Sequence, residues 1–276
     1  MAHVGFQGFG LTAADLDFLT SVVAPDAHDR DRLKRILHED EDFRNSFIED
    51  DRVLGRVIAD KEVFLKISPR LYFEILLRRV RKELEGASHT IEHGGVHKIA
   101  VFDAGKVVDL LSKRDVVLYL ADMLSSFTRV ESYSISYRVR QGVWGKIRFN
   151  DADVDSLLRL LEFAGEEYRP HCYKRIADIC LFLLGVFPES IRWASRCTLA
   201  GEPRPRFIGW AGRSAEEYEE EGRKYYRLAA EHPASRSWDL SEVFQLLHDS
   251  FRVARKPLTL LAENYIQQRR RSLFEA

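Results

Sequence analysis

The stretch Arg169–Ser190, RPHCYKRIADICLFLLGVFPES, decides the fold, because it changes from charged to wholly apolar within one segment. At ~100° per residue, His171, Arg175 and Asp178 fall on one stripe of a helix. Beyond Asp178 the helix is apolar on every side, which is typical of a helix buried in a protein core. The segment therefore predicts a globular protein in which several helices surround this one.

The stripe of His171, Arg175 and Asp178 is the first candidate site. A lone buried carboxylate is costly unless a cation or several donors compensate it. We therefore expect Asp178 to be buried and paired with Arg175, or with a base from another helix, in an ion pair that fixes helix packing. The alternative is a polar pocket in a small-molecule-binding protein or an enzyme, with Asp178 as base or orienting group and Arg175 as anion clamp. The sequence leaves open whether the chain is an enzyme.

Helical patterns dominate the rest of the chain. Thr12 and Asp15 form a capping-box pattern, and Ser68-Pro69 opens another helix with a cap followed by proline. Asp239, with a glutamate three residues later, predicts a further cap. We expect a mainly α fold of about nine or ten helices around one core.

The expected organisation is a single integrated helical domain over residues 1–276. A possible substructure divides it into 1–130 and 150–276, joined by a small β-hairpin near 132–149. The strict alternation of YSISYRVR (133–140), followed by a glycine-containing loop and KIRF, predicts that hairpin.

The hairpin is the second candidate site. Four basic residues share its polar face, two from each strand: Arg138, Arg140, Lys146 and Arg148. A basic ribbon can follow a phosphate backbone, so a weak nucleic-acid-binding module is a second alternative function. The acidic sequence NDADVD (150–155) follows directly and would repel nucleic acid, so this partner is the least favoured.

A third candidate site is the histidine-rich segment SHTIEHGGVH (88–97). His89, Glu92 and His93 have the letter pattern of an inverted zinc-protease motif, and His97 adds a possible third nitrogen. Glycines on both sides deny these residues the sustained helix that fixes ligand geometry. We therefore expect an exposed loop here and no bound metal.

Composition and charge narrow the class of protein. The chain has 276 residues, 45% hydrophobic and 31% charged, with a net charge of −1, as in an ordinary globular protein. No apolar run reaches the ~20 residues of a membrane helix, the N-terminus lacks a signal-peptide pattern, and three cysteines without paired spacing favour a reducing cytoplasm. Residues 1–60 hold thirteen acids and seven bases, whereas 61–82 hold seven bases and two acids. We expect such segments to neutralise one another across the fold; the alternative is one basic face on a neutral body.

The chain also resembles a family of uncharacterised bacterial helical proteins. The phrases that carry the resemblance, spread in order over roughly residues 50–270, are ISPRLYFEILLRR, VFD, YLADMLSSFTRV, YKRIADICLFLLGVFPE, EEGRKYYRLAA and FRVARKPLTLLAENYI. The resemblance implies a single integrated helical fold, and it implies no activity, cofactor or partner.

A helical interaction or regulatory protein is the favoured function class, because no catalytic motif is recognisable. The expected partner is another protein or a second copy of the chain, without membrane association. A small-molecule ligand is the alternative, and no cofactor is expected.

Overall fold

The structure of the protein is a computed structural model that describes residues 10–60, 62–94, 97–128, 132–140, 143–191 and 213–267. Within 91–94, 97–99, 132–140 and 143–149 the description covers the backbone. The chain divides into two compact units: residues 1–125 together with the segment from 263 onward, and residues 126–262.

The first unit is helical apart from one hairpin. Its elements are α1 (Ala13–Val23), α2 (Arg30–Glu39), α3 (Glu41–Ile48), α4 (Asp51–Ala59), the 3-10 turn η1 (Val63–Leu65), α5 (Pro69–Glu85), β1 (Thr90–Gly94), β2 (His97–Val101), α6 (Ala104–Ser112) and α7 (Arg114–Ser126). The side chains of α5 and α7 supply much of its core, because both helices are buried around most of their circumference.

The caps predicted at Thr12 and Ser68 are confirmed. Thr12 and Asp15 form a reciprocal capping box at the start of α1, and the Ser68 hydroxyl accepts the backbone N–H of Leu71 at the start of α5. The carboxylate of Asp15 also accepts hydrogen bonds from the backbone N–H of Ser68 at 2.7 Å and from its hydroxyl at 2.8 Å. One buried aspartate therefore joins the beginnings of α1 and α5.

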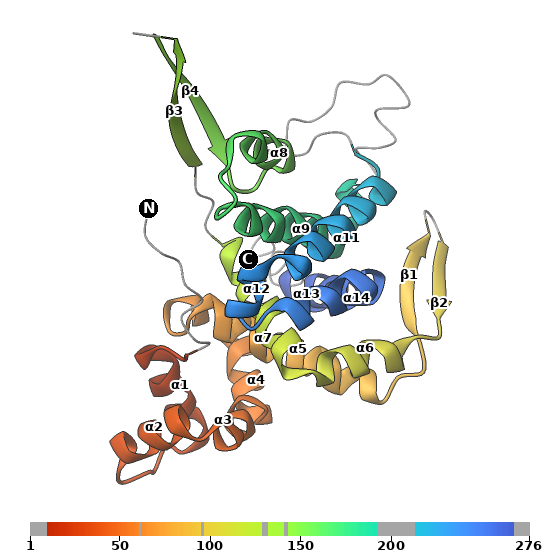
Figure 1. Ribbon diagram of the computed structural model, residues 1–276. Helices are drawn as coiled ribbons and strands as arrows, with labels where there is room; N and C mark the ends of the chain where they lie inside the picture. The colour runs from red at the N-terminus through yellow and green to blue at the C-terminus, as the bar shows by residue number, and fades with distance from the viewer. Residues whose placement is uncertain are drawn as a thin grey trace. The chain divides into compact units, whose positions relative to one another are not determined.

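The second unit contains the longest buried helix of the described residues. Its elements are β3 (Ser132–Arg140), β4 (Val143–Asn150), α8 (Val154–Phe163), α9 (Arg169–Val186), α11 (Ala215–Glu231), α12 (Pro233–Ser237), α13 (Ser241–Asp249) and α14 (Phe251–Leu261); a π-helical turn η2 (Ala262–Gln267) continues α14. Helices α9 and α11 lie side by side (Figure 1). The close packing needs glycine at Gly222 of α11, where an added Cβ would lie 2.9 Å from the Cβ of Cys180 in α9 and 2.6 Å from the ring of Phe251 in α14.

The mainly α fold is confirmed, with three differences in detail. The described ranges hold thirteen α-helices, more than the nine or ten expected, because predicted helical stretches divide into short ones, as at the junction of α3 and α4. A second hairpin, β1–β2, accompanies the expected β3–β4 hairpin, and both are antiparallel. Asp239 does not cap α13: its backbone is left-handed (φ 54°), and Leu240 occupies the cap position.

Whether the chain folds as one domain stays a prediction, although the boundary at 125/126 falls near the expected division at 130. Within the described residues, no helix is long and apolar enough to cross a membrane.

Candidate functional site

Asp178 lies in the core of the second unit, as predicted, but its cationic partner differs from the expected one. Its side chain is 0% exposed, and the Lys174 ammonium lies 2.7 Å from Oδ2. The Tyr226 hydroxyl of α11 donates a 2.8 Å hydrogen bond to Oδ1. Each carboxylate oxygen thus has a partner. The prediction of burial and pairing is confirmed, with Lys174 of the same helix, and not Arg175, as the cation beside the carboxylate.

Lys174 prevails over Arg175 for two physical reasons. It precedes Asp178 by four residues, so the two side chains lie one above the other on the helix, and its flexible stem lets the ammonium reach inward from a position that is 15% exposed. Arg175 instead binds Asp151 and Ser126, which are distant in the sequence.

Arg175 ties the start of the second unit to α9. Its Nε donates to the carbonyl oxygen of Asp151 at 2.7 Å, and its Nη2 lies 3.1 Å from the carboxylate of the same residue. Its Nη1 donates to the hydroxyl of Ser126 at 2.7 Å, and the guanidinium lies 4.1 Å above the centre of the Phe127 ring. Every terminal nitrogen is engaged within the protein, so the arrangement describes a structural clamp on the turn after β4.

His171 faces a third set of neighbours. Its ring lies 4.5 Å from that of Trp238, tilted by 42°, and the rest of the imidazole is exposed. Partial burial, with a smaller effect from the charge of Lys174, lowers the pKa of His171 below its ordinary value. The three residues of the predicted stripe therefore contact different partners, and the structure does not bring their functional groups together.

The two cysteine thiols of α9, Cys172 and Cys180, are expected to be unreactive at neutral pH. Burial raises the pKa of the Cys172 thiol to about 11 and raises that of Cys180 still further. A thiol nucleophile must ionise before it reacts, so neither cysteine of α9 suits nucleophilic catalysis at neutral pH.

The histidine-rich segment is a strand and not the loop expected. Strand β1 begins at Thr90 and pairs with β2, with His93 opposite Lys98 and Glu92 opposite Ile99. In an extended backbone, residues four apart are separated by about 13 Å, so His89 and His93 lose the single-turn spacing that two ligands of one metal need. The side chains of Glu92, His93 and His97 lie outside the described residues, and the absence of metal stays a prediction.

The backbone register of β3–β4 fits the predicted basic face for three of its four residues. Lys146 stands opposite Ser136, Arg148 opposite Ser134 and Arg138 opposite Trp144. The expected alternation is wrong at Arg140, because an irregularity follows Arg138 and Arg140 stands opposite Val143, the neighbour of Trp144. The side chains of all four basic residues lie outside the described residues, so the nucleic-acid interpretation stays a prediction.

A charged groove in the first unit confirms the expected pairing between acidic and basic segments. Its cavity of about 190 Å³ lies among α3, α4 and α5. Arg78 of α5 binds Glu74 at 2.8 Å, Glu49 at 2.8 Å and Asn45 at 2.7 Å, and Lys82 lies 2.9 Å from Asp51. The bases of this groove thus neutralise acids from residues 1–60, which leaves the groove a polar seam between helices.

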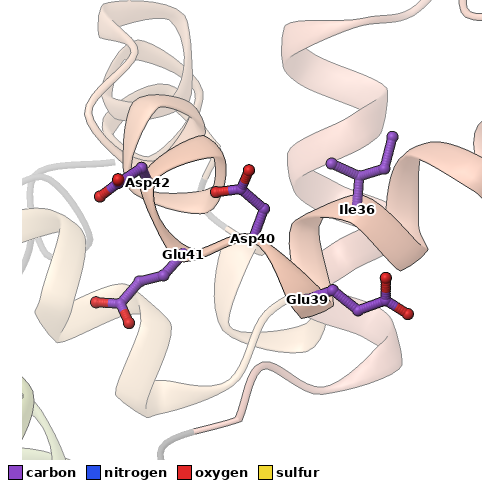
Figure 2. Close-up of a pocket in the computed structure, with 5 residues that line it drawn as sticks. All are labelled: Ile36, Glu39, Asp40, Glu41 and Asp42. Atoms are coloured by element: carbon purple, nitrogen blue, oxygen red, sulfur yellow. The ribbon is translucent and has the colours of Figure 1, made fainter.

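A second, open pocket of about 630 Å³ lies at the junction of α2 and α3. Ile36 and four consecutive acids, Glu39, Asp40, Glu41 and Asp42, line it. Figure 2 shows that the four carboxylates point in different directions around the turn. Asp40 accepts the backbone N–H of Phe43 and so caps α3, and Glu41 pairs with Arg114. Among the described residues, no group of three or more His, Cys, Asp or Glu side chains is placed to hold a metal ion.

The feature that sequence reasoning missed is a set of exposed apolar side chains in the first unit. Ile58 at the end of α4 is 54% exposed, and Phe64 and Leu65 of η1 are 45% and 84% exposed. In the sequence Ile58 looks like an ordinary member of the apolar stripe of α4, so no local pattern marks it as exposed. We call Ile58, Phe64 and Leu65 the apolar surface.

Comparisons with known proteins add no relative. No family model matches the chain, and neither a curated protein nor a solved structure matches it. The resemblance to uncharacterised bacterial helical proteins therefore stays a resemblance.

Proposed function

We propose that the chain is a helical interaction protein that self-associates through the apolar surface of its first unit. Three large apolar side chains within eight residues keep about half or more of their surface exposed when the first unit is folded, although the Phe64 ring also lies 4.3 Å from that of Tyr72, and this observation carries the proposal. Fully burying an exposed Leu, Ile or Phe side chain contributes about 1.5–3 kcal/mol, so Leu65, at 84% exposed, has the most to gain and the half-covered Ile58 and Phe64 would add about half as much each.

The charges beside the apolar surface favour a second copy of the chain as the occupant. Asp60 lies between Ile58 and Phe64 in the sequence, and its carboxylate binds Lys66 at 2.5 Å and lies 3.7 Å from Arg56. The hydrogen bond from Lys66, followed by one from the backbone of Glu62, lowers the pKa of Asp60, so this group stays ionised and paired. In a two-fold interface each patch meets its own copy, and an unbalanced charge would repel itself. The local neutralisation removes that obstacle.

Sedimentation velocity over a range of protein concentrations tests the proposal. We expect a reversible dimer whose dissociation constant rises about tenfold or more in Leu65→Ser, because each copy loses a buried leucine. Phe163→Ser is the matched control, since Phe163 is also an exposed apolar residue (62%) but belongs to the second unit. A wild type that is monomeric at every concentration, or a dimer weakened by Phe163→Ser and not by Leu65→Ser, contradicts the proposal.

The two alternative functions have less support. Both carboxylate oxygens of Asp178 and all three guanidinium nitrogens of Arg175 are engaged within the protein, which counts against a polar ligand pocket there. Nucleic-acid binding by the basic hairpin would fall steeply with added salt and disappear in the double variant Arg138→Ala, Arg140→Ala.

A further inference from the structure

The short helix α12 connects α11 to α13, with a histidine at its N-terminal end and a histidine of α9 against its C-terminal end. His232 occupies its N-cap position, where the ring Nδ1 accepts the backbone N–H of Ala234 at 3.2 Å. Trp238 occupies its C-cap position and rests against the exposed ring of His171 from α9.

The contact at His232 requires an unprotonated Nδ1. A ring nitrogen accepts a hydrogen bond only through its lone pair, so the proton of the neutral imidazole must sit on Nε2. The Nε2 atom lies 3.9 Å from the carboxylate of Glu166, which also lies 3.3 Å from the guanidinium of Arg169. When the ring takes up a second proton, Nδ1 becomes a donor facing another donor, and the cap of α12 is lost.

The attraction between a protonated His232 and the carboxylate of Glu166 does not offset the loss of the cap hydrogen bond. Glu166 is 74% exposed and already shares its charge with Arg169, so its attraction for a protonated His232 is weak and screened by solvent. Histidine is the side chain that changes charge nearest to neutral pH.

The contact between His171 and Trp238 is also weakened by protonation. His171 lies in the first turn of α9, where the helix dipole disfavours a cation, and Lys174 adds a like charge one turn further on. Burial lowers the pKa of His171, so the stability that this contact contributes is complete above the ordinary histidine value and declines as the pH falls below it.

We propose that α12 is a pH-responsive corner of the second unit, held against the start of α9 at neutral pH and released in mild acid by protonation of His232 and His171. The groups that face the two rings are Glu166 and Arg169 from the start of α9 and the preceding turn, Lys174 from α9, and the uncharged Trp238. Asp239, whose backbone is left-handed, follows directly and supplies a turn of low intrinsic stability at which the corner can open.

Hydrogen exchange of the full chain at pH 7.5 and pH 5.0, corrected for the intrinsic pH dependence of amide exchange, tests the corner. In the wild type the protection of residues 234–238 should fall about five- to tenfold on acidification, which corresponds to the loss of a cap. His232→Asn keeps an acceptor at the cap without a titrating group, and His171→Phe keeps an aromatic ring against Trp238. The first should remove most of the pH response, and the two together should abolish it.

His248 provides the control. Its Nδ1 lies 2.8 Å from the carbonyl oxygen of Arg223, so this nitrogen is already a donor and protonation leaves the bond intact. His248→Asn should therefore keep the full response at residues 234–238. The proposal is overturned if nitrogen chemical shifts place the proton of neutral His232 on Nδ1, or if the response survives His232→Asn.

Discussion

Replacing Lys174 by methionine is expected to destabilise the protein more than replacing Asp178 by asparagine, although both changes break the same ion pair. Methionine preserves the length and packing of the lysine stem but removes the ammonium that lies 2.7 Å from a carboxylate that is 0% exposed. Removing one member of a buried pair costs about 3–5 kcal/mol when the other cannot reach water. Asparagine keeps an oxygen for the hydroxyl of Tyr226, and the freed Lys174 ammonium can extend to solvent, so Asp178→Asn should cost about 1 kcal/mol.

Two further variants complete the series. Tyr226→Phe removes one hydrogen bond to a charged group, and we expect a loss of about 1.5–3 kcal/mol. Glu220→Ala alters an exposed residue of the same helix and should change stability by less than about 0.5 kcal/mol.

Urea denaturation followed by circular dichroism, with calorimetry as a second measurement, gives the ranking. A midpoint for Asp178→Asn as low as that of Lys174→Met would refute the argument, because it would mean that Lys174 cannot escape to solvent. A loss below about 1 kcal/mol for Lys174→Met would show that Asp178 does not depend on that lysine.

Three more outcomes follow from the packing and the charges. Gly222→Ala should destabilise the protein by about 1–3 kcal/mol because its Cβ would overlap a phenylalanine ring, whereas Gly55→Ala, with nothing within 4 Å, should stabilise α4 by up to about 1 kcal/mol; thermal melts separate the two. Arg78→Met removes the closer of two guanidinium groups at the buried Glu74, with Arg70 remaining 3.8 Å away, and should cost about 3 kcal/mol in denaturant unfolding, against less than about 1 kcal/mol for Arg52→Ala in an exposed pair. Alkylation at pH 8, resolved by mass spectrometry, should leave Cys172 unmodified in the native protein and modify it after unfolding, because burial holds the pKa of its thiol at about 11.

Local patterns were sufficient to predict much of the fold. The caps at Thr12 and Ser68 are confirmed because a cap depends on residues three positions apart, and the burial of Asp178 is confirmed because the residues after it leave no polar face. The Lys174–Asp178 pair was also visible as a spacing of four residues, but the prediction favoured the stripe that contained Arg175.

Tertiary contacts decided the features that the sequence did not reveal. Arg175 turns to Asp151, which is 24 residues away in the chain, and no local pattern signals that contact. Asp239 had the composition of a cap, yet the corner after α12 holds it in a left-handed conformation and moves the cap to Leu240. The exposure of Ile58 likewise depends on which other helices cover α4, and the periodicity of α4 alone does not reveal it.

The first unit is built from two segments that the second unit separates in the sequence, and this affects the order in which the units can fold during synthesis. This unit includes the segment from Glu263 onward, and the Tyr265 hydroxyl donates a 2.7 Å hydrogen bond to Glu83 of α5. A ribosome delivers residues 126–262 before that segment emerges, so the first unit cannot reach its final form during synthesis until nearly the whole second unit has left the exit tunnel. During synthesis α5 therefore lacks its contact with the segment from Glu263 onward for many seconds, at elongation rates of roughly 5–20 residues per second. Arrested chains of increasing length should show protease resistance of α5 rising only after Tyr265 is released, and resistance that is complete in chains ending before Glu263 would contradict this order.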